Sequence, residues 1–163
     1  QAFHPACITG VRRTVRSSDP AFTSIHAIAE LDSVLPETDL LVMALPSTAE
    51  TVGILSRERI ALLPDSAFVV NVGRGTAIDQ EALCDALNAG QLAGAALDVV
   101  VPEPLPADHP LRRAKNLLLT PHVAGNMTLG YTCDKSVQMF CDDLENYAAG
   151  RPLAHLVDRK RGY

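Results

Sequence analysis

A buried strand and the turn that ends it are encoded by Phe68-Val69-Val70-Asn71-Val72-Gly73-Arg74-Gly75. Its apolar, β-branched first part is typical of a strand inside a parallel sheet. Ligands bind beyond the carboxyl ends of such strands, and the two glycines allow the backbone to turn tightly and to approach a ligand. Between them, Arg74 presents a guanidinium that can hold a carboxylate or a phosphate through two hydrogen bonds. The alternative interpretation is a solvent-exposed arginine in a surface turn.

Apolar runs and helical patterns alternate along the whole chain. Besides residues 67–72, strands are predicted at residues 6–11, 39–45, 93–100 and 116–120. Helices are predicted at residues 26–35, in pieces up to 63, at 80–89 and at 128–149. The helix at 80–89 has Asp79 as its N-cap and Gly90 as its C-terminal stop. This alternation predicts an α/β fold in which helices cover both faces of a parallel sheet.

Composition and charge limit the possible partners. The 163 residues carry a formal net charge of −5, which gives no electrostatic reason to expect a nucleic acid or an anionic membrane as a partner. No apolar run is long enough to span a bilayer. The four cysteines, Cys7, Cys84, Cys133 and Cys141, lack the spacing of a metal site. We therefore predict no bound metal, and buried, reduced thiols in a cytoplasmic protein.

Polar side chains follow four of the predicted strands at the point where each strand ends: Arg12, Arg74, Asp98 and His122. Right-handed crossovers place these strand ends on one edge of the sheet, so the scattered residues are predicted to form one site. In a dinucleotide-binding fold, an arginine at the end of the second strand accommodates a 2′-phosphate. Arg12 and Arg13 have this position, although Arg13 also fits a solvated charge that opens a loop.

A histidine and a glutamate form a candidate acid/base pair. Histidine side chains ordinarily titrate near neutral pH, so a histidine at position 122 can give or take a proton at an active site. Glu103 lies between Pro102 and Pro104, which stiffen its backbone. A carboxylate bonded to one imidazole nitrogen fixes the tautomer and favours the protonated ring. We expect Glu103 within hydrogen-bond or one-water reach of His122; the alternatives are a structural histidine and a glutamate in a surface turn.

Three blocks of sequence resemble the nucleotide-binding part of the D-isomer-specific 2-hydroxyacid dehydrogenases. They are Asn71-Val72-Gly73-Arg74-Gly75, then Ala96-Leu97-Asp98-Val99 with Pro102-Glu103-Pro104-Leu105, and Thr120-Pro121-His122-Val123-Ala124-Gly125. The blocks occur in the order and spacing of the family, and the resemblance covers essentially the whole chain. It implies a Rossmann-type, doubly wound parallel sheet.

The resemblance also implies roles for individual residues. Arg74 would bind the substrate carboxylate and carbonyl, His122 would be the acid/base and Glu103 would hydrogen-bond it. Hydride would pass between NADP or NAD and a small 2-keto acid such as glyoxylate or hydroxypyruvate, and Arg12 slightly favours NADP. The expected partners are this small molecule and, in the parent protein, a second copy of the chain. The residues expected to bind the cofactor are Arg12, Arg13, Pro46, Val72, Gly73, Arg74, Asp98, His122, Ala124 and Gly125.

Two other classes of protein fit parts of the pattern. A non-catalytic regulator that senses NAD(H) on the same fold would keep the cofactor groove. An unrelated Rossmann-type protein such as a methyltransferase needs no set like Arg74, Glu103 and His122. Reduction of a 2-keto acid would separate an enzyme from a regulator.

The chain contains no G-x-G-x-x-G loop, which in the family precedes the strand predicted at residues 6–11. We therefore expect an N-terminally truncated fragment, or the ordered part of a longer chain, that lacks the first strand and the glycine-rich loop. Alone, it is expected to be inactive. Residues 1–125 would be a partial NAD(P)-binding domain. Residues 126–163 would be a long helix and a tail that return toward a missing substrate domain. Without the first strand, the second and third strands would lose their link to the others.

Overall fold

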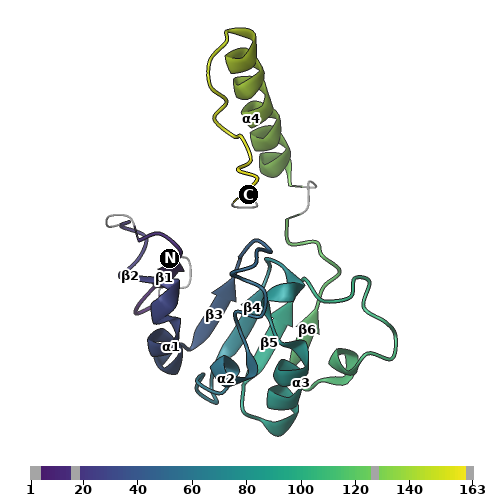
Figure 1. Ribbon diagram of the computed structural model, residues 1–163. Helices are drawn as coiled ribbons and strands as arrows, with labels where there is room; N and C mark the ends of the chain where they lie inside the picture. The colour runs from purple at the N-terminus through teal and green to yellow at the C-terminus, as the bar shows by residue number, and fades with distance from the viewer. Residues whose placement is uncertain (1–4, 16–18, 126–128, 161–163) are drawn as a thin grey trace.

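The computed structural model describes residues 5–15, 19–125 and 129–160. Its six strands form two parallel sheets (Figure 1). One sheet pairs β1 (Thr9–Arg12) with β2 (Ser24–Ala27). The other has the order β3-β4-β5-β6, and its strands are β3 (Leu40–Met43), β4 (Phe68–Asn71), β5 (Gly94–Leu97) and β6 (Leu117–Leu119).

Helices of very different lengths connect and follow these strands. The α-helices are α1 (Leu31–Val34), α2 (Arg57–Ile60), α3 (Gln80–Ala89) and α4 (Gly130–Ala148). Short 3₁₀ turns are η1 (Ile28–Glu30), η2 (Leu35–Glu37), η3 (Gly75–Ala77) and η4 (Pro110–Arg113). No helix in the described ranges is long and apolar enough to cross a membrane. The predicted α/β fold class with parallel strands is confirmed.

One face of the four-stranded sheet forms the core. Side chains in register across the sheet share a face, and on this face Val69 and Leu97 are buried, at 0% and 2% exposure. They pack with α3, whose Leu83 and Leu87 are almost completely buried. In Figure 1, α2 and α3 lie on the same side of this sheet.

The opposite face of this sheet is open among the described residues. Leu40 and Val42 on β3, Phe68 on β4 and Leu118 on β6 are 50–62% exposed. A hollow of about 580 Å³ lies over this face, and the loops that follow β4 and β6 do not line it. The prediction of helices on both faces is therefore not met here. The strand order explains this, because right-handed crossovers that progress in one direction place their helices on one face.

The second and third strands, predicted at residues 6–11 and 39–45, were expected to lose their link to the others. This holds for β1, which pairs with β2 in a separate sheet, but not for β3, which pairs in parallel with β4. β2 was not among the predicted strands, and a helix was predicted from residue 26. Residues 24–27 instead pair in parallel with β1, and a helical segment begins at Ile28. A strand of four half-buried residues is too short to show a period.

Local signals predicted α3 well. The Asp79 Oδ1 accepts a hydrogen bond from the Ala82 N–H at 2.9 Å, and Gly90 takes the left-handed conformation with φ of 73°. The predicted helix at 128–149 is also present as α4, although residue 128 lies outside the described residues. The structure buries no residue of α4. The prediction of buried thiols is wrong for Cys7, Cys133 and Cys141, which are exposed, and right for Cys84.

Candidate active site

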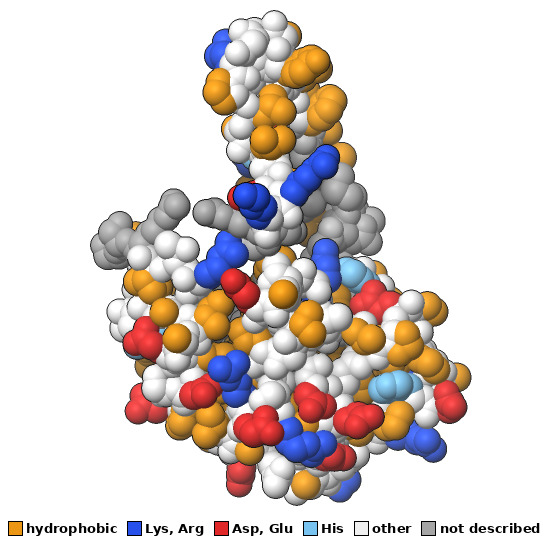
Figure 2. Space-filling view, in the orientation of Figure 1, with side chains coloured by type: hydrophobic (Ala, Val, Ile, Leu, Met, Phe, Trp, Pro, Cys, Tyr) orange, Lys and Arg blue, Asp and Glu red, His pale blue; other side chains and the backbone are white. Residues whose placement is uncertain are grey.

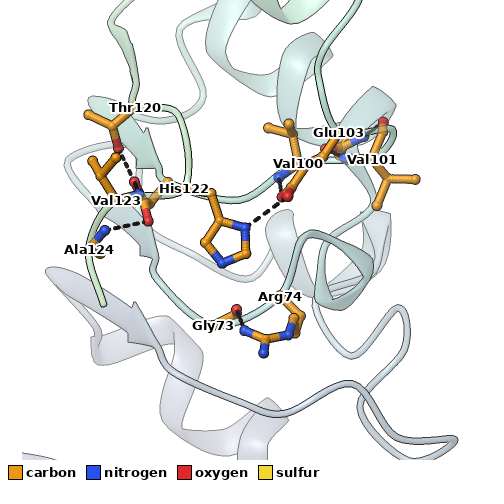
Figure 3. A network of polar contacts seen from close by, with 11 residues as sticks. Gly73, Arg74, Val100, Val101, Glu103, Thr120, His122, Val123 and Ala124 are labelled. Atoms are coloured by element: carbon orange, nitrogen blue, oxygen red, sulfur yellow. Dashed lines mark hydrogen bonds and ion pairs between the residues drawn. The ribbon is translucent and has the colours of Figure 1, made fainter. Parts of the chain in front are cut away.

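The loops after β4, β5 and β6 meet at the carboxyl edge of the four-stranded sheet (Figure 3). Arg74 follows β4, Asp98 follows β5 directly, and His122 lies three residues beyond the end of β6. The loop after β5 also carries Glu103. In the view of Figure 3 the imidazole of His122 lies above Arg74, and its Nδ1 faces Glu103.

His122 and Glu103 form the predicted pair. The imidazole Nδ1 lies 2.8 Å from the Glu103 Oε2, and both side chains are partly exposed. The other carboxylate oxygen accepts the Val100 N–H at 2.9 Å, which fixes the glutamate against its own loop. In the described part of the chain the imidazole Nε2 has no hydrogen-bond partner, so it is available to a ligand.

The environment of Glu103 stabilises its ionised form. The hydrogen bond with His122 contributes most to lowering the pKa of Glu103, followed by the Val100 N–H and by the charges of His122 and Arg74. Because Arg74 acts on this carboxylate, the three side chains share one electrostatic environment. Glu103 therefore stays a carboxylate at neutral pH and acts only as an acceptor toward the imidazole.

Asp98 holds the loop that carries His122. Asp98 is 6% exposed, and its carboxylate accepts hydrogen bonds from the Thr120 hydroxyl at 2.5 Å, the Val123 N–H at 2.9 Å and the Ala124 N–H at 2.8 Å. Desolvation raises the pKa of Asp98, but these bonds outweigh it and hold the pKa below its ordinary value. His122, between the bonded residues, has a φ of 55°, which is rarely adopted by a residue with a side chain. The bonds from Asp98 thus help to maintain this conformation.

The Gly-Arg-Gly turn packs closely against the backbones of two neighbouring segments. A Cβ atom on Gly73 would lie 2.6 Å from the backbone of Leu45, and one on Gly75 would lie 2.4 Å from the backbone of Val100. Both positions therefore require glycine, as predicted for a turn of close approach. Arg74 is exposed, and its Nη1 donates to the Gly73 carbonyl at 2.7 Å.

The remaining candidates for cofactor binding fall into two groups. One group lies at or beyond the carboxyl ends of β3, β4 and β6 and consists of Pro46, Val72, Ala124 and Gly125. All of these except Pro46 are exposed. Arg12 and Arg13 lie in the other sheet, at the end of β1. Arg12 pairs with Asp19 at 3.0 Å and stacks on Phe22, whereas Arg13 lies 3.7 Å from Glu50.

These residues fit part of a nicotinamide dinucleotide. A carboxylate has about four acceptor positions, so Asp98 retains one beyond its three bonds, which suits an amide N–H donor such as a carboxamide. The exposed Val72 offers an apolar contact for a ring. The described residues offer no glycine-rich cradle for a pyrophosphate. The fit therefore applies to the nicotinamide end and, through Arg12, to the adenosine ribose.

Sequence reasoning missed two contributions to this edge. It gave Asp98 only a role toward the cofactor, but the structure shows that Asp98 also anchors the loop of His122. It treated Asn71 as a strand residue, whereas its side chain bonds to the Gly73–Arg74 turn. A polar residue at the end of an otherwise apolar strand was the available signal, because a buried amide needs partners.

With this geometry in view, comparison with known proteins identifies the class. The sequence profile of the D-isomer specific 2-hydroxyacid dehydrogenase NAD binding domain matches residues 2–124. The match covers more than half of the chain, so the chain belongs to this family. The family, the Rossmann-type fold and a nicotinamide dinucleotide as cofactor, predicted from three sequence blocks, are confirmed.

Individual relatives are similar over most of this chain. Glyoxylate/hydroxypyruvate reductase A of Klebsiella pneumoniae (strain 342) is 39% identical over 148 residues, which are 91% of this chain and 46% of that protein. A D-isomer specific 2-hydroxyacid dehydrogenase from Xanthobacter autotrophicus Py2, solved with NADPH and MES, has a TM-score of 0.86 at 35% identity and covers 99% of this chain and 65% of its own.

An NADPH-dependent glyoxylate/hydroxypyruvate reductase from Sinorhizobium meliloti, solved with NADP and sulfate, gives a TM-score of 0.81 at 30% identity. That match covers 95% of this chain and 49% of the reductase. The chain thus spans about half the length of the curated relatives that it matches.

Proposed function

We propose that this chain is the nucleotide-binding part of an NAD(P)H-dependent oxidoreductase that reduces a small 2-keto acid to a 2-hydroxy acid. Glyoxylate and hydroxypyruvate are the proposed substrates. The observation that carries the proposal is the 2.8 Å contact between His122 and Glu103 at the edge that also presents Arg74. Turnover is expected of the full polypeptide, which is this chain together with the additional length that its relatives have.

In the proposed reaction Arg74 binds the substrate carboxylate, because a guanidinium matches a carboxylate with two hydrogen bonds. The bound nicotinamide supplies the hydride. Negative charge then develops on the keto oxygen, and His122 stabilises it and gives it a proton from Nε2. Glu103 holds the ring through Nδ1, which leaves Nε2 to the substrate. Val72, Gly73 and Asp98 would hold the nicotinamide end.

The names of relatives support the substrate class. A glyoxylate/hydroxypyruvate reductase is 39% identical to this chain over 148 residues. The main alternative is a regulator that binds NAD(H) on the same fold without turnover. The pairing of His122 with a carboxylate favours catalysis, since a regulator needs no residue that transfers protons.

The full polypeptide should oxidise NADPH when glyoxylate or hydroxypyruvate is added. His122→Asn should lower kcat by about 100- to 10,000-fold, the range for loss of a general acid. His109→Asn is the matched control, because His109 caps η4 outside this edge. Binding of the dinucleotide with no turnover of either acid would favour the regulator and contradict the proposal.

We further propose that the cofactor is NADPH. Arg12 stands at the end of β1, and two of the solved relatives described above contain NADPH or NADP. Its ion pair with Asp19 and the ring of Phe22 hold the guanidinium in place for a 2′-phosphate. Arg12→Asp in the full polypeptide should reverse the preference in side-by-side assays. A wild type that already prefers NADH would show this assignment to be wrong.

We propose that residues 1–125 form part of the nucleotide-binding domain and that residues 126–163 pack against the substrate domain. The exposed faces of the four-stranded sheet and of α4 support additional partners, either further parts of the same polypeptide or a second copy in a homodimer. The unpaired, exposed thiols suit the reducing cytoplasm.

A further inference from the structure

We propose that Asn71 is a positioning residue: its side-chain amide holds the Gly73–Arg74 turn so that Arg74 meets the substrate carboxylate in a fixed direction. The inference rests on the function proposed above and adds to it a residue that never touches the substrate.

Asn71 is a polar residue at a position where the core is otherwise apolar. It ends β4 and is 1% exposed, in register with Met43 of β3 and Leu97 of β5, which are 5% and 2% exposed. Burying an amide among such neighbours destabilises a protein unless its polar atoms find partners. The side chain must therefore form hydrogen bonds, and those bonds show what it holds.

Both bonds of the amide go to the turn. Its Oδ1 accepts the Gly73 N–H at 3.0 Å, and its Nδ2 donates to the Arg74 carbonyl at 2.9 Å. A backbone N–H only donates and a carbonyl only accepts, so the amide fits in one orientation. The Asn71 backbone is used separately in the sheet, where its carbonyl accepts the Asp98 N–H at 3.0 Å.

The position of the turn determines the position of the guanidinium. The Arg74 Nη1 donates to the Gly73 carbonyl at 2.7 Å, so the head group is attached to the peptide that lies between the two that Asn71 holds. Gly73 and Gly75 are wedged against the backbones of Leu45 and Val100, which limits where the turn can go. Asn71 holds this turn from its buried side, and Arg74 on the same turn is exposed.

A general structural role for Asn71 is the competing explanation. Asn71→Asp tests it, because the variant has the same size and keeps one acceptor but replaces the donor to the Arg74 carbonyl by a negatively charged oxygen. Asn116→Asp is the matched control. The Asn116 Nδ2 also donates to a carbonyl, that of Ala93 at 3.0 Å, but it does so at the opposite edge of the sheet.

The first measurement is amide hydrogen exchange, which needs no activity. Asn71→Asp should accelerate exchange in residues 72–77 by about 10-fold or more, because local opening becomes easier, whereas Asn116→Asp should leave this segment unchanged. Unchanged exchange at 72–77 in Asn71→Asp would overturn the inference, whatever the activity of the protein.

The second measurement is a double-mutant cycle in the full polypeptide. With Arg74 present, Asn71→Asp should lower kcat/KM for glyoxylate by about 10- to 100-fold. In an Arg74→Ala background the same change should lower it by less than about 2-fold, because residues that act through one another are not additive. If Asn71→Asp does not fold, the uncharged Asn71→Ser takes its place in the cycle.

Equal losses in both backgrounds would mean a general structural role and would overturn the inference. A wild type without turnover would instead overturn the proposed function, and the exchange comparison would still decide whether Asn71 holds the turn.

Discussion

Helices α3 and α4 have similar amphipathic patterns but opposite surroundings. α3 packs its apolar side onto the four-stranded sheet, where Leu83 and Leu87 are 0% and 1% exposed. On α4, Phe140 and Leu144 are 67% and 53% exposed, and Figure 2 shows hydrophobic side chains along this helix. An apolar stripe therefore shows which side of a helix can be buried. Whether another surface covers that side depends on the topology of the fold.

The comparison also explains where the site lies. All three loops that meet at the site follow strands of the sheet that α3 covers, and two of them carry residues fixed by buried side chains, Asn71 and Asp98. The uncovered regions, α4 and the outer face of the sheet, carry none of the residues assigned to proton transfer. A rigid packed face thus positions the candidate active site.

The largest expected effect is a difference between two leucine truncations in this 163-residue chain. Leu83→Ala should lower the free energy of unfolding by about 2–5 kcal/mol, because it leaves a cavity in a packed core. Leu144→Ala should change it by less than about 0.5 kcal/mol, as expected for an exposed side chain. Urea unfolding of both variants measures the difference, and equal losses would mean that α4 is packed as tightly as α3.

The free energy of unfolding of the same two variants can also be compared in the full polypeptide. If α4 packs there against another domain or a second copy, Leu144→Ala should become destabilising by more than about 1 kcal/mol. An unchanged Leu144 effect would mean that α4 stays exposed and that the proposed packing of residues 126–163 is incorrect.

A smaller effect is expected at Asp98, on the covered side. Asp98→Asn replaces one acceptor oxygen by a donor, and it should lower the free energy of unfolding by about 1–3 kcal/mol at neutral pH. The folded pKa of Asp98 is lowered, so the stabilisation from its charge is fully present above the unfolded pKa of about 3.9. It should disappear as the pH falls through the folded value. Urea unfolding as a function of pH tests this, and a difference that grows toward low pH would contradict the assignment.

Much of the fold and of the site could be predicted from local signals. Asp79 and Gly90 determined the ends of α3, because a capping carboxylate and a left-handed glycine act within a few residues. Arg74, Asp98 and His122 were found because the carboxyl ends of parallel strands share an edge. Glu103 was found because a proline-flanked carboxylate in that region suited the histidine.

What escaped prediction depends on contacts between distant residues. The burial of Asn71 and the three bonds of Asp98 follow from packing that no short stretch encodes. The exposed thiols Cys133 and Cys141 were misplaced because an apolar helical pattern shows which face could be buried, not whether it is covered. β2 was missed because its four residues acquire their strand conformation by pairing with β1.

We propose that Glu103, through His122, controls proton transfer to a substrate held by Arg74. The decisive measurement is kcat/KM for glyoxylate at neutral pH in Glu103→Gln, with Glu81→Gln on the exposed side of α3 as the matched control. Removal of the carboxylate should lower kcat/KM roughly 10-fold or more, because the imidazole loses the partner that orients it through Nδ1. The control should match the wild type. A wild-type kcat/KM in Glu103→Gln would show that the pair has no part in proton transfer.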